Sequence, residues 1–263
     1  MPRLRRSLLR RYRLFAPRLL SRGLFFLVLL LLLDGVATLY LSQIQAALSL
    51  DTPSGQQGIN VVTPSVASMG EQPVKLASDT FQRPDQTYWG TSSGGQNWQA
   101  DAQTDRNFGI SHAVGFVRAA PGCVDCEAIV GPSVANVEVN FSASLNSYNS
   151  SALCAILRWD GATNLYKLVL DGQSLVLWRV MDGMPIPLQK LAFPARADAF
   201  YTFRFRAVGP QLLAMVWPTN QPQPLDWQIS VKDNALNAGR AGIGVLVRQE
   251  TQAKITAFTE VAL

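Results

Sequence analysis

Apolar and polar residues alternate with a period of two along much of the C-terminal two thirds of the chain. In 137–141, Val and Phe alternate with Glu and Asn, and in 201–206 aromatic residues alternate with Thr and Arg. This pattern is typical of antiparallel strands with one buried face. No segment of this region combines helical spacing with capping residues. The predicted strands are 113–118, 134–143, 152–159, 164–170, 174–181, 200–208, 211–217, 227–231, 242–248 and 254–262.

Within 152–192, Asp-Gly occurs three times between apolar runs, at 160–161, 171–172 and 182–183, with a spacing of eleven residues. This dipeptide favours a two-residue type I′ hairpin turn, because both central residues then need positive φ. The regular spacing predicts an antiparallel meander within a sandwich or barrel. A turn centred on Asp171-Gly172 pairs Leu168 with Leu175, and it places Lys167 and Trp178 on the opposite face.

The N-terminal region has a different pattern, with arginines and apolar residues at helical steps in 1–22. It is interpreted as a basic cytoplasmic amphipathic segment lying on membrane lipid, or as an arginine tail that only fixes topology. Residues 23–43 are apolar and long enough for one transmembrane helix. Asp34 within this span needs a partner helix, a water defect or the far interface.

The positive-inside rule places the arginines in the cytoplasm and the rest of the chain outside the cytoplasmic membrane. A cleavable signal sequence is the alternative, and it also exports the remainder. Residues 44–77 are rich in Gln, Ser, Gly and Pro and are predicted to be a flexible linker. Residues 78–263 contain no such break and are predicted to form one domain.

Charge and cysteine content limit the possible functions. Eight of the 23 Lys and Arg residues lie in 1–22, and the chain after Asp34 has slightly more acidic than basic residues, which argues against nucleic-acid binding. One His and three Cys exclude a rich His/Cys metal site. A local disulfide between Cys123 and Cys126 is the favoured reading, with free thiols or pairing to Cys154 as alternatives. Calcium bound by loop acids remains conceivable.

Two stretches carry a family resemblance. One is Asp79-Thr80-Phe81-Gln82-Arg83 followed by Trp89-Gly90 and Trp98, and the other runs from 201–206 through Trp217 and Trp227 to 239–245. In this order they resemble the concanavalin A-like lectin/glucanase superfamily, in its laminin-G-like and exported bacterial versions. The resemblance implies an all-β, two-sheet antiparallel jelly-roll sandwich with a carbohydrate-facing ancestry.

Glycanases of this superfamily have a row of carboxylates, E-x-D-x-E, on one strand. The nearest match found here is Glu138-Val139-Asn140, which lacks the partner acids. The resemblance therefore implies no catalytic residue, and the chain is expected not to be an enzyme.

A candidate ligand-binding face follows from the strand alternation. If the meander and the strand 200–208 share a sheet, one open face of that sheet contains Trp178, Lys167, Arg204 and Arg206. An aromatic ring beside forked donors suits stacking on a sugar and hydrogen bonds to its hydroxyl or acid groups. Trp159 and Arg158 are candidates for the rim. The alternative is that Trp178 packs under a loop and the arginines are only solvated.

Three functions are compatible with these features. The leading hypothesis is a membrane-anchored, extracytoplasmic, non-catalytic binding module for carbohydrate or cell-envelope glycan. The second is an accessory or scaffold subunit, in which Asp34 meets a membrane protein partner. The third is a glycoside-processing enzyme with carboxylates assembled from several loops.

Overall fold

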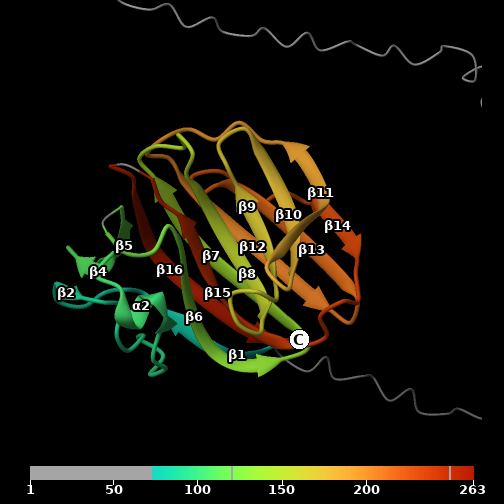
Figure 1. The fold of residues 1–263 in the computed structure, drawn as a ribbon, viewed down its shortest axis with the longest axis horizontal. Coiled ribbons are helices and arrows are strands. Elements are labelled where there is room, and N and C mark those ends of the chain that lie inside the picture. Colours follow the sequence, from blue (N-terminus) through green and yellow to red (C-terminus); the bar gives the residue numbers. More distant parts are fainter. Residues whose placement is uncertain (1–72, 120, 249) are drawn as a thin grey trace, which may run out of the picture. The chain divides into compact units, whose positions relative to one another are not determined.

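The computed structural model of the chain describes residues 73–119, 121–248 and 250–263, all within one compact unit, 68–263. These residues form two antiparallel sheets in two stacked layers (Figure 1), with one short helix, α2 (Asp101–Thr104), among them. For this part of the chain the predicted all-β class and the two-sheet antiparallel sandwich are confirmed.

In the described part of the chain, the larger sheet has nine strands in the order β14–β13–β12–β7–β16–β5–β4–β2, with β1 also paired to β16. Its strands are β1 (Val74–Asp79), β2 (Gln86–Thr87), β4 (Phe108–Ser111), β5 (Val114–Arg118), β7 (Val137–Leu145), β12 (Phe200–Val208), β13 (Gln211–Pro218), β14 (Ile229–Lys232) and β16 (Gln252–Ala262).

The smaller sheet, among the same described residues, has seven strands in the order β11–β10–β9–β8–β15–β6–β3. Its strands are β3 (Gln99–Ala100), β6 (Asp125–Val134), β8 (Ala152–Trp159), β9 (Leu165–Leu170), β10 (Ser174–Met181), β11 (Met184–Ala192) and β15 (Gly239–Leu246). Apolar residues from both sheets fill the layer between them, including the stacked rings of Phe141 and Phe203.

The three Asp-Gly pairs lie between successive strands of the predicted meander, β8 to β11. Asp182 and Gly183 both have positive φ, and they connect Met181 to Met184 in the predicted two-residue turn.

The turn at Asp171 differs from the prediction by one position. The Asp171 carboxylate accepts hydrogen bonds from the N–H groups of Gln173 and Ser174, and only Gly172 has positive φ. The turn therefore centres on Gly172-Gln173, and Leu168 pairs with Leu177 rather than with Leu175. The shift moves each pairing by two residues, so every side chain keeps its predicted face.

Several strands were not predicted from the alternation of residues. β1 begins at Val74, inside the segment 44–77 predicted as a linker, and β6 occupies a stretch interpreted as a loop. The predicted strand 134–143 is the end of β6, a turn and most of β7. Both faces of β6 are largely buried, so its sequence shows no alternation.

β11 pairs with β10 alone among the described strands and forms a free edge of the smaller sheet. Met181 and Met184 close a two-residue turn and form a hydrogen-bonded pair. Hydrogen-bonded and non-hydrogen-bonded pairs then alternate along the hairpin, so the pairs at Pro185 and Pro187 are both non-hydrogen-bonded. The nitrogens of both prolines therefore face away from β10. Proline at these positions removes no hydrogen bond from the hairpin.

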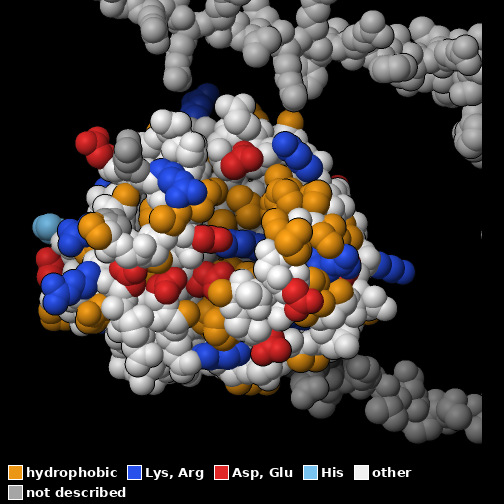
Figure 2. All heavy atoms as spheres, viewed as in Figure 1, with side chains coloured by type: hydrophobic (Ala, Val, Ile, Leu, Met, Phe, Trp, Pro, Cys, Tyr) orange, Lys and Arg blue, Asp and Glu red, His pale blue; other side chains and the backbone are white. Residues whose placement is uncertain are grey.

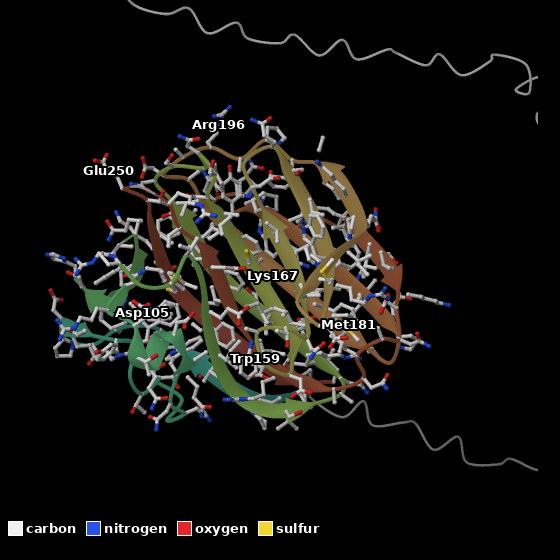
Figure 3. The ribbon with its side chains drawn as sticks, in the orientation of Figure 1. Asp105, Trp159, Lys167, Met181, Arg196 and Glu250 are labelled. Carbon is white, nitrogen blue, oxygen red and sulfur yellow. A yellow bond between two sulfur atoms is a disulfide. The ribbon has the colours of Figure 1, made fainter. Side chains whose placement is uncertain are left out.

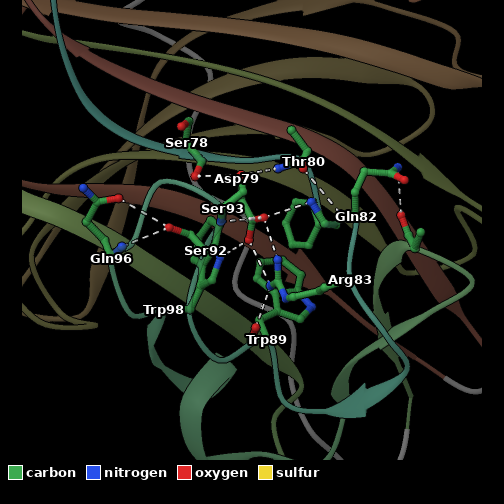
Figure 4. A network of polar contacts seen from close by, with 12 residues as sticks. Ser78, Asp79, Thr80, Gln82, Arg83, Trp89, Ser92, Ser93, Gln96 and Trp98 are labelled. Carbon is green, nitrogen blue, oxygen red and sulfur yellow. Dashed lines mark hydrogen bonds and ion pairs between the residues drawn. The ribbon is translucent and has the colours of Figure 1, made fainter.

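The residues of the first sequence signature form a buried network beside β1 (Figure 4). Arg83 donates from Nη1 and Nη2 to the two carboxylate oxygens of Asp79 at 2.7 and 3.0 Å, and Trp98 Nε1 donates to Asp79 Oδ2 at 2.7 Å. Trp89 packs edge-on against both Trp98 and Phe81. These residues anchor the first strand to the sandwich, which is a structural role.

No helix among the described residues is long and apolar enough to span a membrane. The predicted segments 1–22 and 23–43, the polar position Asp34 and most of the predicted linker lie outside the described residues.

Candidate functional site

A cleft of about 260 Å³ opens on the outer face of the smaller sheet. Figure 2 shows this face, with basic and acidic side chains at its centre and apolar side chains around them. The cleft lies over β9 and β10 next to the turns at Ala162 and Gly183, and its lining includes Trp178, Lys167, Asp125 and Glu127.

Lys167 makes the central polar interaction of the cleft. Its ammonium lies 2.5 Å from Asp125 Oδ1 and 3.9 Å from Glu127 Oε1. The two acids alternate on β6, so both face outward, while Lys167 comes from β9 (Figure 3 labels it near the middle of the sheet). Gly244 of β15 makes room for the lysine because it has no side chain. A Cβ atom at this position would lie only 3.2 Å from Lys167 Cε.

Burial changes the protonation behaviour of this group. Burial raises the pKa of Glu127 above its usual value, and the hydrogen bond from Trp159 and the charge of Lys167 oppose that shift. Burial lowers the pKa of Lys167, whereas the neighbouring Cys154, Asp125 and Glu127 raise it, and the net shift of the pKa is upward. Burial raises the pKa of the Cys154 thiol to about 12, so this cysteine stays a neutral thiol in the cleft floor.

Trp178 and Trp159 are the aromatic residues of this face. Trp178, on β10, is half-buried and lies beside an apolar floor that includes Leu165, Val169 and Val180. Trp159 ends β8, packs on the same apolar cluster, and donates from Nε1 to Glu127 Oε2 at 2.8 Å. The cleft therefore combines an aromatic wall with carboxylate acceptors.

Arg158 is not at the rim, because a β-bulge reverses the alternation of β8. Between Ile156 and Trp159, β8 has one more residue than the facing part of β15, and Arg158 has φ of 50°. Its guanidinium points inward, is almost fully buried, and donates to the carbonyl oxygens of Ala135, Gly209 and Leu236. Arg158 therefore holds loops together and cannot touch a ligand in the cleft.

Arg204 and Arg206 also lie away from the cleft. They are on β12, in the larger sheet, whereas Lys167 and Trp178 are in the smaller one, so the condition for a single shared face is not met. The two arginines face outward from the opposite side of the sandwich, where both bind Glu138 and lie under Trp227.

From the sequence, Asp125 was considered only as one of several loop acids that could meet across a cleft or bind calcium, and its pairing with Glu127 was missed. Asp125-Cys126-Glu127 places two carboxylates on one side of an extended strand, and this spacing was the available signal. The signal was hidden because Cys126 and its surroundings were interpreted as a loop. In the structure Cys123 and Cys126 form a disulfide, with Cys126 already in β6.

Among the described residues, Asp85, Ser111 and His112 are not arranged as a hydrolytic triad. Ser111 Oγ lies 3.0 Å from both Asp85 Oδ2 and His112 Nδ1, and His112 donates to Asp85 Oδ1 through its backbone N–H at 2.8 Å. The acid therefore contacts the serine hydroxyl and not the imidazole ring, unlike in a hydrolytic triad. Within the described residues no three His, Cys, Asp or Glu side chains converge in a way that could hold a metal ion.

The strand order and pairing define an antiparallel two-sheet β-sandwich, and solved structures with this kind of fold are similar to it. A xylan β-1,4-xylosidase from Bacillus halodurans is similar over 70% of this chain and 38% of its own, with 10% identity and a TM-score of 0.53. The carbohydrate-binding module CBM66 from Bacillus subtilis matches over 56% and 86% (14% identity, TM-score 0.48). A β-glucanase from Bacillus licheniformis matches over 73% and 100% (10% identity, TM-score 0.49).

The structural similarity thus extends to a carbohydrate-binding module and to glycoside hydrolases. At these identities it shows the fold alone, and the chain spans only 38% of the xylosidase. No family model and no curated protein matches the sequence.

Proposed function

We propose that this chain is a non-catalytic module that binds carbohydrate, such as cell-envelope glycan, in the cleft of the smaller sheet. The main support is the position of Trp178 next to the Lys167–Asp125–Glu127 group in one cleft. An indole ring packs against the apolar face of a sugar, and carboxylate oxygens accept hydrogen bonds from its hydroxyls. The xylosidase with the same fold makes glycans the first ligand class to test.

A glycan array probed with the full-length chain in mild detergent tests this function. Replacing Trp178 with Ala is expected to weaken binding about tenfold or more, because aromatic side chains in a cleft carry much of the binding energy. Phe116→Ala, at a partly buried aromatic residue of the larger sheet, is the matched control and should bind normally. Absence of any glycan binding, or equal binding by the Trp178 variant, would contradict the proposal.

Glycoside hydrolysis is the second candidate, favoured by the two carboxylates of β6. Their Cα atoms are about 7 Å apart along the strand, and a raised pKa like that of Glu127 is a property of a general acid. Against this, Glu127 is 6% exposed and Trp159 occupies one of its oxygens. Release of reducing sugar by the wild type but not by Glu127→Gln would favour the enzyme over the binding module.

The proposed location is outside the cytoplasmic membrane, with residues 23–43 as an uncleaved single-pass anchor. Its support is the apolar length of this span and the arginines that precede it. A reporter enzyme that works only outside the cytoplasm should be active when it is fused within 44–77. The chain should also stay in the membrane fraction during extraction at high pH. Native gel migration as a stable larger complex would instead favour the accessory-subunit function suggested by Asp34.

A further inference from the structure

The outer face of the larger sheet carries a second charged group, here termed the arginine platform: Arg204, Arg206, Glu138 and Trp227. Arg206 faces Glu138 across the β12–β7 pair, and Arg204 lies diagonally opposite. Arg204 Nε donates to Glu138 Oε1 at 2.9 Å and Arg206 Nε donates to Oε2 at 2.6 Å. One carboxylate therefore fixes the orientation of two guanidinium groups.

Trp227 holds the same two groups from a second direction. Its ring lies 5.1 Å from the guanidinium carbon of Arg204 and 5.3 Å from that of Arg206. The neighbouring Gln228 side chain bonds both the N–H and the carbonyl oxygen of Val216, which fixes the segment that carries Trp227 to β13. The platform is rigid before any ligand arrives, so a ligand need not order it.

The ends of both guanidinium groups remain available. Within the described residues, the terminal nitrogens of Arg204 and Arg206 have no hydrogen-bond partner, and they are not among the buried polar atoms. The two side chains are 24% and 28% exposed. Two positive charges share one negative charge, so the platform has a surplus of one positive charge and of unused donors.

We propose that the arginine platform is a second binding site, distinct from the cleft, for the carboxylates of an acidic oligosaccharide. A guanidinium fork binds a carboxylate through two parallel hydrogen bonds, which an ammonium cannot do. One exposed hydroxyl lies near the same row of β12: Thr219 Oγ1 is 2.9 Å from Oγ1 of Thr202, which is itself buried and also bonded to Ser142. This site does not depend on carbohydrate binding in the cleft.

Binding of oligogalacturonate to the full-length chain in mild detergent, measured by calorimetry, tests this site. Arg204→Gln is expected to weaken binding about tenfold, because a charge-assisted hydrogen bond is lost while Glu138 keeps Arg206 as a partner. Arg204→Lys keeps the charge but loses the fork and should weaken binding severalfold. Arg106→Gln removes an exposed arginine elsewhere and is the matched control. Thermal melting of each variant checks that it is folded.

Each of the following results would overturn the proposal: no binding of oligogalacturonate, equal loss in the Arg106 and Arg204 variants, or full binding by Arg204→Lys. Equal affinity for the methyl-esterified oligosaccharide would also overturn it, because the ester lacks the negative charge. If inorganic phosphate displaced oligogalacturonate at the same concentration, the platform would be a general anion site and not a site for acidic oligosaccharides, which would also overturn the proposal. Trp178→Ala should leave oligogalacturonate binding unchanged, so failure of the cleft and failure of the platform are separable.

Discussion

The cleft and the arginine platform contain the same kinds of group in opposite proportions. In the cleft one ammonium lies between two carboxylates, and on the platform one carboxylate lies between two guanidinium groups. Each has a tryptophan beside it. The cleft is left with spare acceptors and suits hydroxyl or amino donors, whereas the platform is left with spare donors and suits acids.

Burial is the second difference between the two groups. The side chains of Lys167 and Glu127 are 9% and 8% exposed, while those of the platform arginines are about a quarter exposed. The remaining acids differ the other way, because Asp125 in the cleft is 56% exposed and Glu138 on the platform is 11% exposed. Removing one partner of a buried ion pair leaves a charge without compensation, but water replaces a lost partner at the surface. The same kind of substitution should therefore have unequal effects on stability at the two sites.

The largest effect is expected for Lys167→Met. Glu127 then remains buried beside Asp125 without a cation, and the free energy of unfolding should fall by about 3 kcal/mol at pH 7 in urea titrations. The loss should be smaller at pH 5, where Glu127 can take up a proton. Lys190→Met, at an exposed position of β11, is the control, with an expected change below about 0.5 kcal/mol. Equal stability of the two variants would show that the cleft lysine is not needed.

A buried acid outside both groups sharpens the comparison. Glu260 on β16 is fully buried, neither carboxyl oxygen has a hydrogen-bond partner among the described residues, and burial raises its pKa to about 8, with Arg240 opposing. The folded state then keeps a proton that the unfolded state has released, so stability is highest below pH 4.5 and decreases as the pH rises through 8.

We expect this carboxyl to lower the free energy of unfolding progressively between pH 5 and pH 9. Glu260→Gln should reduce that loss, so the difference in melting temperature between variant and wild type should grow with pH. A constant difference at all pH values would mean that Glu260 is ionised in the folded protein throughout this range.

The smallest effect is expected for Glu138→Gln on the platform. Both arginines stay near the surface and can be hydrated, so the free energy of unfolding should fall by about 1 kcal/mol or less. Oligogalacturonate should still bind, because the terminal nitrogens are unchanged. A loss as large as that of Lys167→Met would show that the platform is a structural ion pair rather than a binding surface.

The architecture could be predicted from the sequence where local signals were strong. The Asp-Gly turns and the alternating strands, such as 201–206, specify two layers because each strand must bury one face. β6 and β11 were missed for physical reasons. β6 is largely buried on both faces, and prolines and exposed apolar residues remove the alternation from β11.

The candidate site was less predictable because it depends on which strands are neighbours. Lys167 and Trp178 face the cleft as the meander register required, but nothing local in the sequence indicates that β12 belongs to the other sheet. The inward turn of Arg158 depends on a single extra residue in β8, which reverses the two faces of that strand. Lys167 on β9 reaches Asp125 and Glu127 on β6 across two intervening strands, β8 and β15, where Gly244 leaves room for its side chain.

The prolines of β11 determine what can assemble next to the cleft. At Pro185 and Pro187 the outward side of the edge strand has no N–H groups, so an extended peptide finds an incomplete ladder there. A second copy of the domain meets the same obstacle, which disfavours sheet growth from one molecule to the next even at high local concentration. Ligands that approach from this side must be recognised through side chains, and carbohydrate meets that requirement.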